Sequence, residues 1–326
     1  MDDRRRTFLK AAAAGTLAAG CMNAAHARGN KEMPPQALGL LFDGTLCIGC
    51  RACMSACKEA NDMPAERTPL VSAVGTVERL WESPLDLSGR TLNTINAYVD
   101  GNGSAKDREV DGFAFTKYSC YHCADPSCVS ACPVSAMKKD AVTGIVSYDK
   151  GACIGCRYCV AACPFGVPRF TYDTPFPVIS KCQLCADRMK DGKYAACAEV
   201  CPTGATLFGP VAELRKEVAR RKALEPGKDA VFPRGKIGGN DAHVRKAAKY
   251  IDHVYGEKEI GGTQVLHMSA VPFEKLGKPA LPDTSPASLS ETVSHTVYQG
   301  MVAPIAFLGA LAYIAKRNTK DDEDKE

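Results

Sequence analysis

The sequence lacks the features of a nucleic-acid-binding protein and of an enzyme with its own substrate. Its formal net charge is only +4 over 326 residues, so bulk electrostatics gives no reason to expect a nucleic-acid partner. Its basic residues are not interleaved with aromatic side chains, as they are in many nucleic-acid-binding segments. It also contains no catalytic triad, phosphate-binding loop or open metal site. These absences argue against catalysis of a substrate reaction by this chain alone.

Cysteine is the residue that the sequence has in excess. The chain has 17 cysteines, and its hydrophobic content of 45% is enough for one or two packed domains. Cys21 stands apart near the N-terminus, and the other sixteen form four groups of four. The groups are Cys47, Cys50, Cys53 and Cys57; Cys120, Cys123, Cys128 and Cys132; Cys153, Cys156, Cys159 and Cys163; and Cys182, Cys185, Cys197 and Cys201.

The spacing within the groups indicates iron–sulfur chemistry. The first and third groups read C-x2-C-x2-C-x3-C, which is the bacterial ferredoxin spacing, and the second and fourth have a longer middle gap. Three closely spaced thiolates can wrap one cubane cluster, whereas the fourth cysteine points to the neighbouring cluster of a pair. The sixteen cysteines are therefore predicted to be iron ligands of four [4Fe-4S] clusters.

Residues beside the cysteines fit this interpretation. Gly49 and Gly155 allow the backbone to fold closely over a cluster and to present N–H groups to its sulfurs. A proline follows the last cysteine in three groups and suits the first turn of a helix, whereas Lys58 follows Cys57 and predicts a less fixed turn. The three prolines are Pro133, Pro164 and Pro202.

The groups are also related by an internal repeat. Residues 42–53 are echoed by residues 148–159, and residues 128–133 match residues 197–202. The first and third groups are therefore copies, as are the second and fourth. This pattern indicates a module that was duplicated and then nested.

Other uses of the cysteines fit less well. C-x2-C-x2-C is poor geometry for one tetrahedral zinc ion, and a disulfide framework suits smaller secreted domains. Each group is complete, which argues against the loss of a cluster. His122 lies between two cysteines of a complete site, so we expect it to be a hydrogen-bonding neighbour and not a ligand.

The N-terminus is typical of an export signal. Arg5 and Arg6 precede Thr-Phe-Leu-Lys, an apolar run over 11–19 and a small-residue site at 25–27. The paired arginines resemble the twin-arginine type, which exports folded proteins and so lets metal-bound cysteines escape oxidation. A cleaved signal over 1–27 is expected, with lipidation of Cys21 as the alternative.

Outside the cysteine groups, we expect short strands and loops. Residues 144–148 predict a strand before the third group. Residues 66–112 form an insertion that contains Trp81 and a glycine-rich turn at 101–103; it is interpreted either as a surface excursion toward a partner or as a solvated loop. Residues 211–223 have helical spacing, and residues 279–290 are typical of a linker. Basic residues between them predict a solvated face, with an acidic partner as the alternative.

The C-terminus predicts a membrane anchor. Residues 297–315 are almost wholly apolar and are followed by Lys316 and Arg317. Nineteen residues are about the length that a bilayer requires, and the positive charges place the tail in the cytoplasm. An apolar helix packed against the globular part is the alternative.

The cysteine array resembles the iron–sulfur subunits of membrane-bound bacterial respiratory oxidoreductases. The resemblance implies an α+β fold with two nested bacterial-ferredoxin-like units, in which groups one and four share a unit and groups two and three share the other. It implies crossed ligand sets. These are Cys47, Cys50, Cys53 and Cys201; Cys182, Cys185, Cys197 and Cys57; Cys120, Cys123, Cys128 and Cys163; and Cys153, Cys156, Cys159 and Cys132.

Segments outside the cysteines resemble one branch of this family, the HybA-type iron–sulfur components of hydrogenase-2-like uptake [NiFe]-hydrogenases. These segments are 254–259, 261–266 and 295–320. The resemblance implies an electron-transfer subunit, not an enzyme, with partners in the [NiFe]-hydrogenase small and large subunits and in a multispanning quinone-reactive membrane subunit. A relay of a formate dehydrogenase and a zinc-binding assembly or scaffold protein are the alternatives.

These expectations define the organisation of the chain. It would lie on the periplasmic face of the bacterial inner membrane, held by a single C-terminal anchor. The parts are a signal peptide at 1–27, a four-cluster domain at 28–210, an extension and linker at 211–296, a transmembrane helix at 297–315 and a cytoplasmic tail at 316–326.

Overall fold

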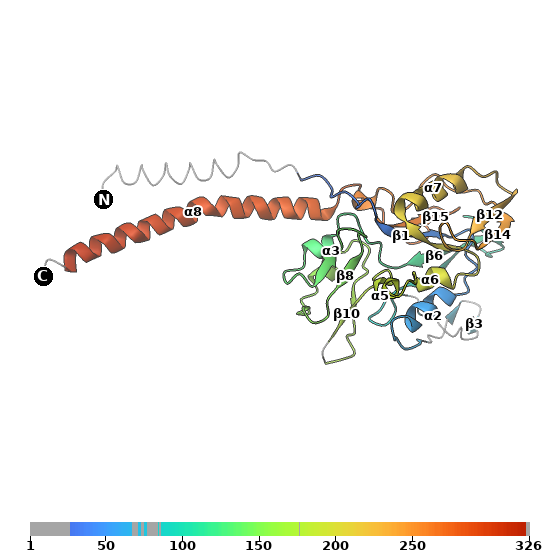
Figure 1. The fold of residues 1–326 in the computed structure, drawn as a ribbon, viewed down its shortest axis with the longest axis horizontal. Helices are drawn as coiled ribbons and strands as arrows, with labels where there is room; N and C mark the ends of the chain where they lie inside the picture. The colour runs from blue at the N-terminus through green and yellow to red at the C-terminus, as the bar shows by residue number, and fades with distance from the viewer. Residues whose placement is uncertain are drawn as a thin grey trace. The chain divides into compact units, whose positions relative to one another are not determined.

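The computed structural model describes residues 27–66, 71–72, 75–76, 84, 86–175 and 177–323, which form two compact units (Figure 1). The larger unit is Asn30–Ser285, and the smaller one combines the described residues up to Gly29 with the C-terminal helix. Apart from Ala27, the expected signal segment with Cys21 lies outside the described residues, as does Trp81.

A four-stranded sheet organises the larger unit. Its order is β13-β11-β1-β15, in which β1 runs antiparallel to β11 and parallel to β15. Because side chains alternate along a strand, β1 supplies both faces of the sheet with apolar residues. Leu41 packs in the cluster on the face of helix α7, whereas Leu40 and Phe42 pack in the cluster that contains cysteines. The elements are β1 (Leu38–Asp43), β11 (Thr206–Pro210), β13 (Gly235–Lys236), β15 (Val265–Met268) and α7 (Val211–Lys222).

A glycine makes the central pairing possible. A Cβ atom at Gly39 would lie 1.9 Å from the backbone oxygen of Gln264. Glycine is therefore required where β1 and the chain leading into β15 approach each other most closely.

The predicted C-terminal extension is part of the larger unit as far as Ser285. The strand β15 pairs with β1, and the backbone N–H of Ala124 donates to the carbonyl of Gly262 at 2.9 Å. The boundary expected at residue 210 therefore does not divide this unit, because strand pairing joins residues far apart in the sequence. The predicted helix over 211–223 is confirmed by α7.

The described part of the predicted insertion is buried over residues 91–95, whereas residues 97–111 are exposed or half-buried, as a surface segment would be. Its strands β4 and β5 both pair with β6, which begins at the last residue of the insertion, and the predicted turn at 101–103 lies between β4 and β5. Thr91, Asn93 and Ile95 are buried. The burial of residues 91–95 is not expected from the sequence because the segment has no cysteine, although Ile95 packs in one cluster with Cys47 and Cys53. The strands are β4 (Thr94–Val99), β5 (Ala105–Lys106) and β6 (Gly112–Tyr118).

Short helices and two-stranded sheets carry or flank the cysteine groups. The strand expected over 144–148 is present as β8. The helices are α2 (Ala52–Glu59), α3 (Ser127–Ser130), α4 (Tyr158–Ala162), α5 (Ala186–Lys190) and α6 (Ala196–Glu199), with the 3-10 helix η1 (Glu259–Gly261). The paired strands are β2 (Val71–Ser72) with β3 (Gly75–Thr76), β7 (Met137–Lys139) with β8 (Val146–Tyr148), β9 (Arg169–Phe170) with β10 (Ile179–Ser180), and β12 (Asp229–Pro233) with β14 (Ala242–Lys246).

The expectation that the prolines begin helices is wrong. Each lies in a turn after a short helix, where the backbone carbonyl of the preceding cysteine accepts a hydrogen bond from the residue three positions later. Proline suits the second position of such a turn because its ring fixes φ. Where Lys58 replaces proline, α2 instead continues to Glu59, so the lysine lengthens a helix. These prolines are Pro133, Pro164 and Pro202.

A buried ion-pair network joins α7 to the sheet. The guanidinium of Arg221 contacts Asp43 at 2.8 Å and Glu217 at 2.7 Å, and Arg221 and Asp43 are 0% exposed. Tyr250 also donates to Asp43 at 2.8 Å. Removing one partner of a buried pair leaves an uncompensated charge in a medium that solvates it poorly.

We therefore expect Arg221→Met to lower the free energy of unfolding by about 3–5 kcal/mol. The measurement is the guanidinium concentration at which the visible absorbance of the bound clusters is lost. Lys216→Met is the matched control, because Lys216 pairs with Glu213 on the exposed face of the same helix, and it should change the stability by less than about 0.5 kcal/mol. Equal midpoints for the two variants would contradict this role of Arg221.

The smaller unit contains one long helix, α8 (Pro286–Glu323). Residues 286–290, expected to belong to a linker, are its first turn, so the linker ends at Ser285. Among the described residues, Pro286–Ile314 is long and apolar enough to cross a membrane, with a mean hydropathy of 1.6 and no buried residue in its apolar window. Within this unit Arg28 pairs with Glu291 at 2.8 Å.

Candidate iron–sulfur sites

The first site joins cysteines from the two ends of the cysteine array. Three cysteines of the first group and Cys201 of the fourth line one cavity, which contains about 310 Å³ of space free of protein atoms, part of it open to solvent. The first three lie on the loop and helix α2 that follow β1, whereas Cys201 precedes β11. Pairing of β1 with β11 brings these segments together. The three are Cys47, Cys50 and Cys53.

The second site has the reciprocal composition. Cys57 of the first group lines a cavity of about 320 Å³ with three cysteines of the fourth. Because α2 packs against α6, Cys57 on α2 faces the fourth group while Cys53, one turn earlier, lines the first cavity. Asn93 and Lys117 line the same space. The three cysteines are Cys182, Cys185 and Cys197.

The third site has the same composition but combines the second and third cysteine groups. Cys132 of the second group lines a cavity of about 330 Å³ with three cysteines of the third group. Helices α3 and α4 carry or flank these groups and pack together. The three cysteines are Cys153, Cys156 and Cys159.

The remaining four cysteines interact with one another. Burial raises the pKa of Cys123 well above its ordinary value, and the negative charges of Cys163, Cys128 and Cys120 raise it further. Cys120 and Cys163 also pack in one hydrophobic cluster. Twelve of the sixteen predicted cysteines thus line three cavities, each with three from one group and one from another, and the remaining four act on one another electrostatically.

The buried thiols need a positively charged partner to be present as thiolates. Burial raises the pKa of Cys53 and of Cys57 to about 12, and that of Cys47 and of Cys159 to about 11. Iron ligation favours the deprotonated form of a cysteine. Each of the three cavities is lined by four cysteines, of which one or two are buried and the others half-buried or exposed. Four thiols around a space free of protein atoms fit a cluster of iron and sulfide.

Backbone N–H groups point at several of the sulfurs. Gly49 donates to Cys47 at 3.4 Å, Leu184 to Cys182 at 3.3 Å, and Thr206 N–H to Cys201 at 3.5 Å. Such bonds stabilise negative charge on the sulfur and tune the potential of a cluster. The predicted N–H contact of Gly49 is thereby present.

The backbone preserves the repeat seen in the sequence. Gly49 and Gly155 both have φ +71°, and Arg51 and Arg157, two residues later, have φ 59° and 66°. This left-handed conformation favours glycine, which explains why both copies have glycine between the first two cysteines. The two loops therefore fold alike.

His122, which lies between two of the cysteines, accepts a hydrogen bond from the backbone. It is fully buried, and its Nδ1 accepts a hydrogen bond from the backbone N–H of Val146 at 3.0 Å. Burial, with the charges of Lys181 and Lys139, holds its pKa well below 6.5. The ring is therefore neutral.

Sequence reasoning missed three side chains beside the sites, those of Asn93, Lys117 and Thr206. Asn93 donates to the carbonyl of Cys53 at 3.4 Å, and Lys117 donates to Thr206 at 3.3 Å. Only the alignment of the two repeats could have singled out Lys117, because that position is Ile179 in the other copy.

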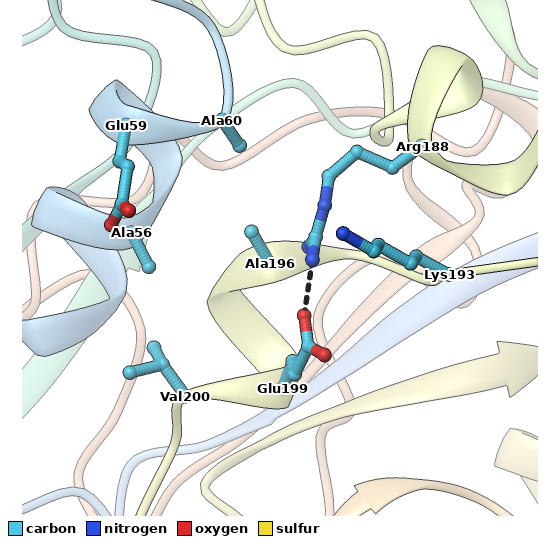
Figure 2. Close-up of a pocket in the computed structure, with 8 residues that line it drawn as sticks. All are labelled: Ala56, Glu59, Ala60, Arg188, Lys193, Ala196, Glu199 and Val200. Carbon is cyan, nitrogen blue, oxygen red and sulfur yellow. Dashed lines mark hydrogen bonds and ion pairs between the residues drawn. The ribbon is translucent and has the colours of Figure 1, made fainter. Parts of the chain in front are cut away.

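A separate surface pocket, with about 750 Å³ of space free of protein atoms, part of it open to solvent, lies between helices α2, α5 and α6 (Figure 2). Arg188 and Glu199 form an ion pair there, and Figure 2 shows Lys193 beside Arg188. With Glu59 on the α2 side, two basic and two acidic residues line it. This balance gives the pocket no preference for a charged ligand.

Comparison with known proteins identifies the family. Residues 112–211, which hold the second, third and fourth cysteine groups, match the model of a 4Fe-4S dicluster domain. Proteins named hydrogenase-2 operon protein HybA, from Escherichia coli O157:H7 and Shigella flexneri, are each 45% identical over 324 residues, covering 98% of this chain and 96% of theirs. The chain belongs to the HybA family. The formate dehydrogenase-O iron–sulfur subunit of Escherichia coli K12 is 33% identical over 84% of this chain and 79% of its own.

As a HybA-family member, the chain is an iron–sulfur electron-transfer subunit and not an enzyme in its own right. The predicted resemblance and the [4Fe-4S] chemistry are confirmed.

Proposed function

We propose that the sixteen cysteines bind four [4Fe-4S] clusters in the crossed sets described above, within two nested ferredoxin-like units. The observation that carries the proposal is that each of three cavities is lined by three cysteines of one group and one of another. When bound, such clusters take up and release single electrons. The chain's own residues hold the iron through thiolates, donate N–H groups to sulfurs and exclude most of the solvent.

We further propose that the chain carries electrons between a [NiFe]-hydrogenase small subunit, which works with its large subunit, and a quinone-reactive integral membrane subunit. The name of the 45% identical relatives, a hydrogenase-2 operon protein, supports a hydrogenase as the donor. A periplasmic location is supported by the twin-arginine-like sequence over 1–27. The apolar helix α8, followed by Lys316 and Arg317, supports a single anchor with a cytoplasmic tail.

A formate dehydrogenase relay is the second candidate. It is favoured by identities of 30% and 33% with two formate dehydrogenase iron–sulfur subunits, each over 84% of the chain. Both candidates use the same clusters and differ only in the donor. A zinc-binding scaffold is the candidate of another class.

The first test is purification of the tagged chain from membranes in mild detergent without oxygen, followed by mass spectrometry of the associated proteins. We expect a [NiFe]-hydrogenase and a multispanning subunit. Copurification of a molybdenum formate dehydrogenase instead would agree with an electron-transfer role but would contradict a hydrogenase as the electron donor.

The second test is metal and sulfide analysis of the same sample. Four cubane clusters predict about sixteen iron atoms and as many acid-labile sulfides per chain. Zinc in place of iron, with no acid-labile sulfide, would contradict the proposal that the chain transfers electrons through iron–sulfur clusters.

A further inference from the structure

Lys117 is a lysine buried among cysteines. It is the third residue before Cys120, lies on β6 and is 1% exposed. Burial alone would lower the pKa of Lys117, but negative charge on Cys197, Cys53 and Cys201, followed by Cys57, raises that pKa above its ordinary value. These cysteines belong to both sites that combine the first and fourth groups.

A hydrogen bond places Lys117 between those two sites. Its side chain lines the cavity of Cys57 and the fourth group. Its Nζ donates to Thr206 Oγ1 at 3.3 Å, and Thr206 lines the neighbouring cavity, where its backbone N–H donates to Cys201. One ammonium group therefore lies beside two candidate clusters.

The repeat has an apolar residue at the equivalent position. Ile179 is the third residue before Cys182, just as Lys117 is the third before Cys120. Ile179 is 2% exposed, lines the cavity of Cys132 and the third group, and packs in one cluster with Cys128 and Cys159. It thus contacts the other pair of sites but brings no charge.

A buried positive charge favours whichever redox state of a neighbouring group is more negative. Uptake of an electron adds one negative charge to a cluster, so a fixed ammonium group raises the reduction potential. Solvent and salt screen such a charge poorly in the interior. The other half contains lysines of its own: Lys181, which is as buried as Lys117, and Lys139 act on Cys128 and Cys123. Hydrogen bonds from Lys181 Nζ to the carbonyls of Val146 and Cys182 leave its charge in place.

We propose that Lys117 is a potential-setting residue, whose buried charge makes the two clusters of the first and fourth groups easier to reduce than an isoleucine would. The proposal rests on the proposed function, because it assumes four clusters in the crossed sets.

The test is a redox titration followed by electron paramagnetic resonance on the complex extracted from membranes. Lys117→Met should move two of the four reduction steps to lower potential. We expect the reduced-to-oxidised ratio at a given potential to fall about tenfold, which corresponds to about 59 mV for one electron. Lys117→Arg should restore the wild-type values, and Ile179→Met, an apolar exchange at the equivalent position, should leave all four steps unchanged.

The outcomes separate this inference from the proposed function. Wild-type protein with fewer than four clusters would overturn the proposed function. Four clusters whose potentials are the same in wild type and Lys117→Met would overturn only the role of Lys117. If Lys117→Met does not retain its iron, the same comparison is made between Lys117→Gln and Lys117→Arg, and equal potentials again reject the role. Ile179→Lys should raise the reduction potentials of clusters other than the two whose potentials Lys117→Met lowers. If both variants shift the same two potentials, the two residues do not lie beside different pairs of sites.

Discussion

Replacing Cys57 and Cys197 together is expected to remove one cluster, whereas replacing Cys57 and Cys53 together is expected to remove two. Cys57 and Cys197 line the same cavity, although 139 positions separate them (197 − 57 − 1). Cys53 lies on the same helix as Cys57 but lines the neighbouring cavity. The iron content should therefore fall from about sixteen to about twelve atoms in the first variant and to about eight in the second.

The measurement is iron and sulfide analysis of protein prepared without oxygen. Electron paramagnetic resonance on the same samples would detect any three-iron cluster left by an incomplete ligand set. Ligation confined to each sequence group predicts the opposite order, with the smaller loss in the Cys53 and Cys57 variant. That result would contradict the crossed sets.

Ending the chain at Ser285 is expected to move the protein from the membrane to the soluble fraction. The truncation removes α8, which contains the only candidate membrane span found among the described residues, and leaves the compact unit Asn30–Ser285 whole. Burial of its apolar side chains in lipid is the main force that would hold such a helix in a bilayer. We expect almost complete release.

The experiment should use cells that lack the membrane partner, because a bound partner could retain the truncated chain. The iron content serves as the control and should stay at about sixteen atoms. The sequence left open the alternative that this helix packs against the globular part. In that case the truncation would expose apolar surface, and the iron content or the stability of the protein would fall. Full-length Leu308→Arg offers a milder test, since a central arginine disfavours insertion and Leu308 is exposed in α8.

Several features that position the sites could not be predicted because they depend on contacts between distant residues. The segment before β6 was interpreted as an insertion, yet Asn93 lines a cavity beside Cys57. Residues after 210 were assigned to an extension, yet β15 lies beside β1 in the central sheet. Hydropathy and turn patterns report the local environment of a segment and do not show which distant strand it pairs with.

The sequence by itself determined the number of thiols, their type and the loops that carry them. A ferredoxin loop is local, since its cysteines lie within a few residues of one another and its glycine sets the backbone, so the spacing and the repeat were enough. Only the tertiary structure decided which groups share a cavity and which side chains lie between the cavities. The pairing of β1 with β11 brings Cys201 to the first group, and the fold of β6 inserts Lys117 between the two sites. These contacts join residues far apart in the chain, where spacing carries no information.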